Sequence, residues 1–144
     1  MIIPDVNLLV YAYSERSPWH VASSQWWTAA LNGSEDIGIA VAVALGFVRL
    51  MSNPKVVDRP VRPELLLRTV ESWLDLPRVR LVGPGFRHFE AMAALFAQSS
   101  AQFDLMTDIH IAALALENRA VVHSNDSEFM RFPSVMVHNP LSGK

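Results

Sequence analysis

Residues 1–13, MIIPDVNLLVYAY, contain the pattern from which the expected fold follows. Residues 1–4 form a short apolar run that predicts a buried strand, and this run ends at Asp5. Apolar side chains then recur at helical spacing from Leu8 to Ala12, which predicts a helix. A strand that passes directly into a helix is typical of an α/β fold.

The alternation of strands and helices continues along the whole chain. Further strands are predicted at residues 37–40, 79–82, 120–123 and 135–137. One further helix is predicted from Ser17-Pro18 to Asn32-Gly33, and another follows the strand at 37–40 and runs to about Met51. Three more are predicted from Pro63 onward, around residues 86–96 and over residues 109–116. Because too many residues separate the strands for hairpins, we expect a mainly parallel sheet with helices on both faces, in one domain spanning residues 1–144.

The composition limits the chemistry that this chain can perform. It has 144 residues and no Cys, so disulfide scaffolds, thiol nucleophiles and cysteine-ligated metals are excluded. Any reactive site must therefore use oxygen or imidazole groups. The net charge of −2 excludes a strongly basic surface of the kind that holds duplex nucleic acid, but it permits a nuclease with local basic patches.

The hydrophobic fraction of 51% raises the question of a membrane segment. The longest apolar stretch, residues 37–50, contains Arg49 and is shorter than the ~20 residues that a membrane-spanning helix needs. The N-terminus has no basic region before its apolar residues, as an export signal would. We therefore expect a cytoplasmic protein with no membrane segment.

Three aspartates are placed where a parallel sheet binds its ligands. Asp5 follows the first strand, Asp126 follows a late strand, and Asp108 opens the most apolar helix. Ligands of such sheets lie beyond the carboxyl ends of the strands, so these side chains should meet at one edge. Each aspartate taken alone could instead be a helix cap or a turn residue.

Close approach of several carboxylates has a chemical consequence. Two carboxylates ~4 Å apart repel by about 4 kcal/mol at an effective dielectric constant near 20. Such a group therefore needs protons or a cation. Ligands that offer only oxygen suit Mg²⁺ or Mn²⁺, and such an ion can activate water for attack on a phosphodiester.

Four blocks of the sequence, in this order, resemble those of PIN-domain proteins, specifically the VapC toxins of type II toxin-antitoxin pairs. The blocks are MIIPDVNLLVYAY, GFVRLMSNP, TDIHIAALALENRAVV and HSNDSEFMRFP. The resemblance implies a three-layer α/β/α domain with Mg²⁺- or Mn²⁺-dependent endoribonuclease activity. It also implies RNA as the substrate and inhibition by a cognate VapB antitoxin.

The resemblance also implies roles for particular residues. Asp5 and Asp108 match the principal metal ligands, and Asp126 matches the acidic residue of the closing turn, which would assist through a second metal or a bound water. Possible supporting residues are Glu128, Asn7 and Ser124. A solvated role for Glu128, and helix-start or turn roles for the other two, are the alternatives.

One position departs from the family pattern. Many PIN proteins have Glu in a mid-chain L-x-E-F-x-R sequence, whereas this chain has Gly46 there, between Leu45 and Phe47. A subgroup of VapC toxins shares the GFVRL pattern, so we still expect an active ribonuclease. The alternative is a catalytically weakened PIN-like module that acts through antitoxin binding. A DNA-directed or flap nuclease would need longer insertions.

Other polar and aromatic residues carry weaker signals. The histidines lack a metal-ligand spacing such as H-E-x-x-H. Arg49, Lys55 and Arg131 could contact RNA phosphates, although a solvated or ion-paired role is the simpler interpretation for each. Aromatic-rich helices at 18–31 and 63–75 suggest a homodimer and a groove for an antitoxin helix.

Overall fold

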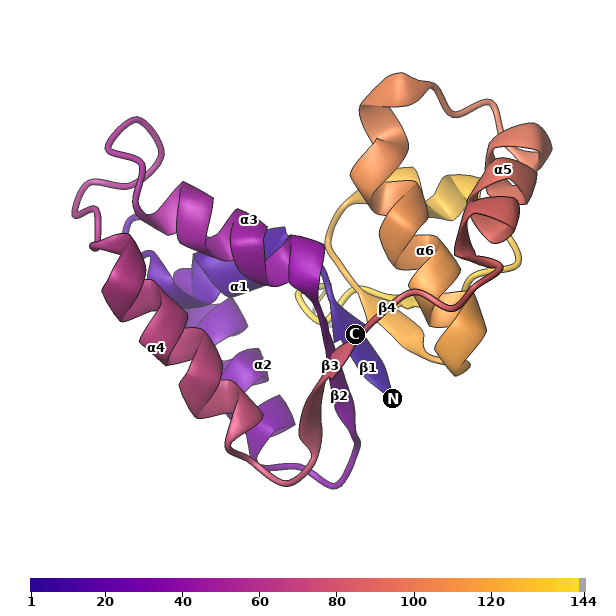
Figure 1. Cartoon of the computed structure of the whole chain (residues 1–144). Coiled ribbons are helices and arrows are strands. Elements are labelled where there is room, and N and C mark those ends of the chain that lie inside the picture. The colour runs from indigo at the N-terminus through magenta and orange to yellow at the C-terminus, as the bar shows by residue number, and fades with distance from the viewer. Residues whose placement is uncertain (143–144) are drawn as a thin grey trace.

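The computed structural model, which describes residues 1–142, is built on a parallel sheet with the strand order β3-β2-β1-β4-β5 (Figure 1). The strands are β1 (Ile2–Pro4), β2 (Ile37–Ala40), β3 (Val79–Val82), β4 (Val121–His123) and β5 (Val137–His138). All four neighbouring pairs are parallel. The predicted α/β fold with a mainly parallel sheet is therefore confirmed.

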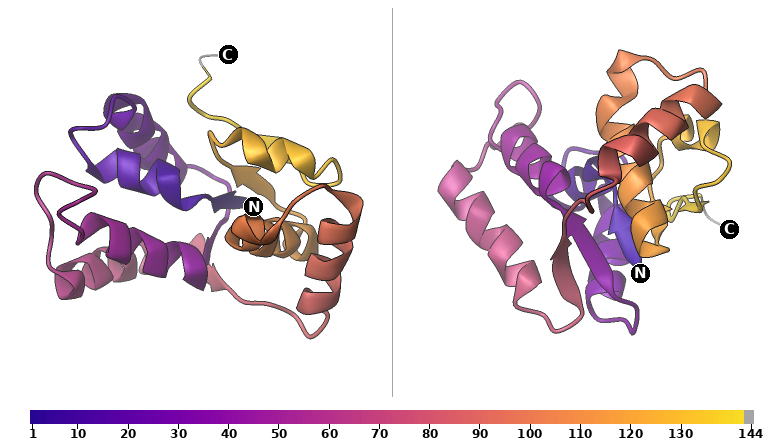
Figure 2. Two further views of the ribbon diagram at one scale, coloured as in Figure 1. Left: turned by 90° about the horizontal axis from the view of Figure 1, so that it is seen from above. Right: turned by 45° about the vertical axis from the view of Figure 1, so that its right-hand side comes forward.

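Helices cover both faces of this sheet. The α-helices are α1 (Val6–Tyr13), α2 (His20–Leu31), α3 (Val41–Met51), α4 (Pro63–Leu74), α5 (His88–Gln98) and α6 (Met106–Asn118). Two short 3₁₀ helices are η1 (Phe103–Leu105) and η2 (Ser127–Arg131). Helices α1 to α4 lie on one side of the sheet, and α5, α6 and η2 lie on the other (Figures 1 and 2).

Chain topology explains this division into three layers. The chain steps from β1 to β2 and then to β3 in one direction along the sheet, whereas it steps from β4 to β5 in the other. Right-handed crossovers in opposite directions place their helices on opposite faces. Consequently the connections that leave the adjacent strands β1 and β4 diverge to different sides at the carboxyl edge of the sheet, which is where parallel sheets bind their ligands.

Burial of apolar side chains accounts for the central elements. All three residues of β1 are buried, and in α6 Ile109 and every residue from Ile111 to Ala115 are buried. The sequence predicted a helix that is apolar on several faces here, and the structure confirms it. Arg119 ends α6 in the left-handed conformation, with φ 50°, and turns the chain into β4. Within residues 1–142, no helix has the length and apolar character needed to cross a membrane.

Some predicted boundaries are confirmed and others are wrong. The strands predicted at 37–40 and 79–82 match β2 and β3. The last strand was predicted at 135–137, but it is β5 at Val137–His138. The reason is a turn in which the Val135 amide donates to the carbonyl of Phe132, so this segment packs against the core before it pairs with β4. Helix α2 begins at His20 rather than at Ser17, because the intervening residues form a turn.

Candidate active site

Asp5 lies at the carboxyl edge of the sheet, between β1 and α1. Its backbone N–H donates to the carbonyl of His123 at 2.9 Å, which continues the pairing of β1 with β4. Its Oδ1 accepts a 2.8 Å hydrogen bond from the amide of Val6 and so caps α1. The predicted cap role is therefore present, and it points the other carboxyl oxygen toward β4.

Ser124 connects Asp5 to the turn that follows β4. Its hydroxyl donates to Oδ2 of Asp5 at 2.8 Å and accepts from the amide of Asp126 at 3.0 Å. Asp5 is 3% exposed and Ser124 is 1% exposed, so this contact is screened from solvent. The structure thus places Ser124 where a supporting donor was expected.

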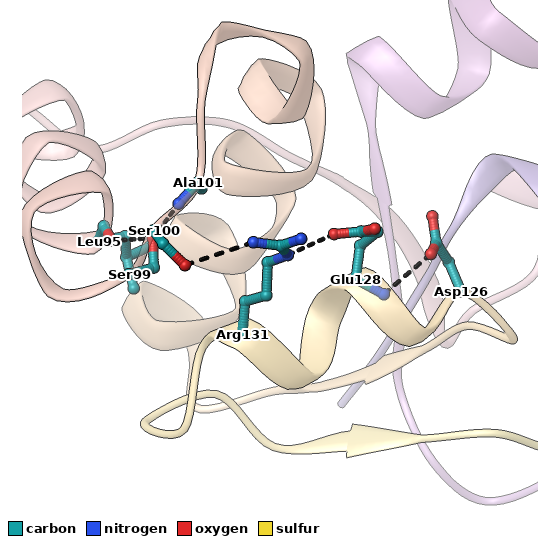
Figure 3. Close-up of polar contacts among 7 residues, drawn as sticks. All are labelled: Leu95, Ser99, Ser100, Ala101, Asp126, Glu128 and Arg131. Carbon is teal, nitrogen blue, oxygen red and sulfur yellow. Dashed lines mark hydrogen bonds and ion pairs between the residues drawn. The ribbon is translucent and has the colours of Figure 1, made fainter.

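Asp126 caps the 3₁₀ helix η2, as a turn residue would. Its Oδ1 accepts a 2.9 Å hydrogen bond from the amide of Glu128. The carboxylate of Glu128 in turn forms an ion pair with Arg131, one turn further along η2 (Figure 3). Glu128 is therefore a paired side chain rather than a merely solvated one.

Asp108 lies in the first turn of α6, half-buried, at the same edge of the sheet. The pKa of this carboxyl is raised from 3.8 to about 7, and burial is the largest cause. Repulsion by other carboxylates contributes the rest of this shift, and these belong, in decreasing order of effect, to Asp5, Asp126, Glu128 and Asp104. We refer to Asp5, Asp104, Asp108, Asp126 and Glu128 together as the carboxylate cluster.

The pKa of Asp5 is also raised. Burial is the main cause, and repulsion by Asp126 adds to it. The hydrogen bonds from Ser124 and from the amide of Val6 favour the ionised form and lower the pKa in part. Asp5 and Asp108 are therefore the members whose charge is least well compensated by the protein itself.

The carboxylate cluster does not form a closed coordination shell as it stands. Within residues 1–142, no group of three His or acidic side chains is gathered closely enough to hold a metal ion. The predicted aspartates thus share one region and perturb one another's ionisation, but their oxygens do not converge on one point. The donors are all carboxylate oxygens, which is the chemistry that Mg²⁺ and Mn²⁺ prefer.

Comparison with known proteins identifies the family. The model of the PIN domain family matches residues 2–134. This chain belongs to the PIN domain family. Among curated proteins it is similar to Ribonuclease VapC37 of Mycobacterium tuberculosis H37Rv, with 37% identity over 140 residues and 97% of each chain covered. It is also similar to Ribonuclease VapC33 of the same organism, with 34% identity over 141 residues, covering 98% of this chain and 99% of the relative.

Solved structures support the PIN fold. FitAcB from Neisseria gonorrhoeae matches with a TM-score of 0.67 and 20% identity, covering 99% of each chain. VapBC2 from Rickettsia felis, bound to a DNA fragment from its promoter, matches with a TM-score of 0.66 and 18% identity, covering 96% of this chain and 98% of the other. The three-layer arrangement is thus the one that PIN domains share.

Asp104 is a member of the carboxylate cluster that the sequence analysis missed. It lies in η1, which runs directly into α6, so it precedes Asp108 by about one helical turn. The signal was the spacing of four between the two aspartates, which puts both side chains on one face of a helix. Asn7, by contrast, was predicted as a supporting donor, yet its side chain makes no hydrogen bond within residues 1–142.

Gly46 occupies the place of the usual PIN glutamate on α3, and it is buried against α1. A Cβ atom added there would lie 3.3 Å from Cγ2 of Val6, the residue whose amide Asp5 caps. Glycine therefore allows α3 to approach the start of α1 closely. The position contributes no carboxylate to the site.

The histidines lie outside the carboxylate cluster. His110 is bonded to His88, and the other ring nitrogen of His88 contacts Glu117, in each case at 2.7 Å. His123 accepts a hydrogen bond from the indole of Trp26. None of these rings is among the causes that shift the pKa of Asp5 or Asp108. The expectation of a site built on carboxylates rather than on imidazole agrees with this arrangement.

Proposed function

We propose that this PIN domain is a Mg²⁺- or Mn²⁺-dependent endoribonuclease and the toxin of a VapBC-type pair. The observation that carries the proposal is the position of Asp108 beside other carboxylates, with a pKa of about 7 that results mainly from burial and in part from their repulsion. Full-length similarity to relatives named VapC ribonucleases supports RNA as the substrate class.

The carboxylate cluster fits a hard divalent cation by its donor chemistry. Asp5 and Asp108 would be the principal ligands, and Asp126 and Glu128 would assist. Such an ion, when bound, would activate water and stabilise negative charge during attack on a phosphodiester. Ser124 would hold Asp5 ionised and oriented, and the other carboxyl groups would have to move closer together than they stand.

The activity is tested by incubating total RNA with the purified chain, with Mg²⁺, with Mn²⁺ and with a chelator. Cleavage should require the metal. Asp5→Asn and Asp108→Asn should each lower the cleavage rate by at least ~100-fold while the fold, monitored by circular dichroism, persists. Asp75→Asn is the matched control, because this exposed aspartate lies at the end of α4. Unchanged cleavage in the first two variants would remove those residues from the mechanism.

Partner binding forms the second part of the proposal. Several structural neighbours are named as VapBC or toxin-antitoxin complexes. Exposed apolar side chains on or beside the two aromatic-rich helices offer a surface for such a partner or for a second copy, namely Trp19, Val21, Leu65 and Leu67. We expect a homodimer in the cytoplasm that binds a VapB-type antitoxin. Light scattering that finds a monomer at high concentration would contradict the dimer.

The alternative is a PIN module that has lost catalysis and acts through antitoxin binding. Gly46 favours it, because this position supplies no ligand. The two functions differ in a metal titration. A protein that shows neither Mn²⁺ binding nor ribonuclease activity, yet binds a VapB-type partner, would be the module.

A further inference from the structure

The carboxylate cluster repels the substrate that the proposed function assigns to it. An RNA strand carries a negative charge at each phosphate, and every member of the cluster is acidic. A bound cation offsets only part of this charge. A ribonuclease site of this kind therefore needs a basic group of its own beside the scissile phosphate.

Arg131 is the one basic side chain that is bonded to the carboxylate cluster in the described part of the chain. Its Nε donates to Oε2 of Glu128 at 2.5 Å. Its Nη1 donates to the hydroxyl of Ser100 at 3.4 Å. Figure 3 shows the guanidinium lying between these two groups, with Asp126 beyond Glu128.

The segment that carries Ser100 is tied to the end of α5 through its neighbour Ser99. It follows α5, where the hydroxyl of Ser99 donates to the carbonyl of Leu95 at 2.8 Å. The amide of Ala101 donates back to the Ser99 hydroxyl at 3.3 Å (Figure 3). Arg131 thus bridges the end of α5 and η2, two segments on the same side of the sheet.

The guanidinium still has donors to offer. An arginine has five N–H groups, and within residues 1–142 Nη2 of Arg131 makes no hydrogen bond. The side chains of Arg131 and Glu128 are 43% and 39% exposed, so solvent reaches their ion pair. Pairs this exposed contribute little net stability, and exchanging the Glu128 carboxylate for another oxyanion costs correspondingly little.

We propose that Arg131 binds a phosphate group of single-stranded RNA next to the carboxylate cluster, and that it exchanges Glu128 for that phosphate when the substrate enters. The inference rests on the proposed function. A guanidinium presents parallel N–H groups that match two phosphate oxygens, whereas an ammonium acts as a point charge. Ser100 would keep the guanidinium at the site while Glu128 is released.

The competing explanation is a purely structural pair that fixes η2. The two explanations differ in what the Glu128→Gln variant does. If Arg131 binds phosphate, Glu128→Gln frees the guanidinium and tightens RNA binding, whereas Arg131→Gln weakens it. If the pair only fixes η2, Glu128→Gln acts only by removing an acidic charge and tightens RNA binding equally in an Arg131→Gln background. If Arg131 binds phosphate, Arg131→Gln removes most of that tightening.

The test measures binding of a short fluorescein-labelled single-stranded RNA by anisotropy, with a chelator present and in an Asp108→Asn background to prevent cleavage. The NaCl concentration is varied from about 50 to 200 mM. Arg131→Gln should weaken binding about tenfold and lower the slope of log K against log salt by about one. Arg131→Lys should keep the slope and recover part of the affinity. Arg62→Gln, which removes an exposed arginine paired with Glu64 on α4, is the matched control and should leave binding within about twofold.

The outcomes separate this inference from the proposed function. If the wild-type chain cleaves RNA with Mn²⁺ but Arg131→Gln binds RNA with unchanged affinity and salt slope, the role of Arg131 is overturned and the ribonuclease stands. Tightening by Glu128→Gln that is equally large with and without Arg131 also overturns it, as does equal weakening by Glu128→Gln and Arg131→Gln. If the wild-type chain neither cleaves nor binds RNA, the proposed function fails and this inference fails with it.

Discussion

The hydroxyl of Ser124 donates a 2.8 Å hydrogen bond to Oδ2 of Asp5, a contact between residues 119 positions apart in the sequence. Both side chains are buried. The bond joins the ends of the two adjacent strands β1 and β4 at the point where their connections diverge. It also favours the charged form of a carboxylate that burial would otherwise protonate.

Ser124→Ala should therefore destabilise the protein. The substitution leaves a buried carboxyl oxygen without its donor and removes the acceptor of the Asp126 amide, so we expect a loss of about 1–3 kcal/mol in the free energy of unfolding. Urea denaturation at neutral pH measures it. Ser72→Ala is the control, since the Ser72 hydroxyl makes only an exposed bond within α4, and it should change stability by less than about 0.5 kcal/mol. Equal effects of the two substitutions would contradict the role of Ser124.

Asp108→Asn should stabilise the metal-free protein, and only at higher pH. The folded-state pKa of Asp108 is about 7 and the reference value is 3.8, so the folded state binds the extra proton between these values. Stability therefore falls as the pH rises from about 4 to 7, and it stays low above 7. The amide removes this loss, so the variant should gain about 1–2 kcal/mol at pH 8, after discounting for solvent around this half-buried group, and nothing at pH 4.

Thermal unfolding in the presence of a chelator, at both pH values, checks this prediction for Asp108. The exposed Asp75→Asn variant serves as the reference and should stay within about 0.5 kcal/mol of the wild type. A stabilisation of Asp108→Asn that is the same at pH 4 and pH 8 would show that ionisation of Asp108 is not its cause.

Metal binding should release a proton near neutral pH. Asp108 must lose its proton to act as a ligand, and its pKa in the metal-free protein is about 7. The dissociation constant for Mn²⁺ should thus rise up to tenfold for each pH unit below 7 and level off above it. At a hundredfold excess over this constant the ion should stabilise the fold by about 2.7 kcal/mol. Calorimetry in buffers of different ionisation enthalpy counts the protons. Affinity that is equal at pH 6 and pH 8 would contradict the assignment of Asp108 as a ligand.

Short apolar runs bounded by turn residues allowed much of the fold to be predicted. Strands β2 and β3 match their predicted limits because all of β2 and both ends of β3 are buried. The position of Asp5 after β1 followed from the same pattern. Asp104 was not predicted, because the polar residues before it suggested a loop and hid the start of η1.

Contacts between distant segments lay beyond sequence reasoning. Ser100 and Arg131 are 31 positions apart, and nothing in either segment specifies their pairing. The same holds for the ring of His88, which is buried between Glu117 and His110. Such contacts depend on how α5 packs beside α6 and η2, which a local pattern does not encode.

Gly46→Ala should affect Asp5 through the packing of α3 against α1. Alanine is favoured over glycine in a helix by about 1 kcal/mol, but its Cβ would lie only 3.3 Å from Cγ2 of Val6. The gain and the crowding should nearly cancel, so we expect a change in stability below about 1 kcal/mol. Because the amide of Val6 donates to Oδ1 of Asp5, displacement of α1 should move this carboxylate and lower Mn²⁺ affinity. In a Val6→Ala background the crowding is absent, and Gly46→Ala should then stabilise the fold by about 1 kcal/mol and leave Mn²⁺ affinity unchanged. A double-mutant cycle on unfolding and on Mn²⁺ binding measures the coupling, and additive effects of the two substitutions would exclude it.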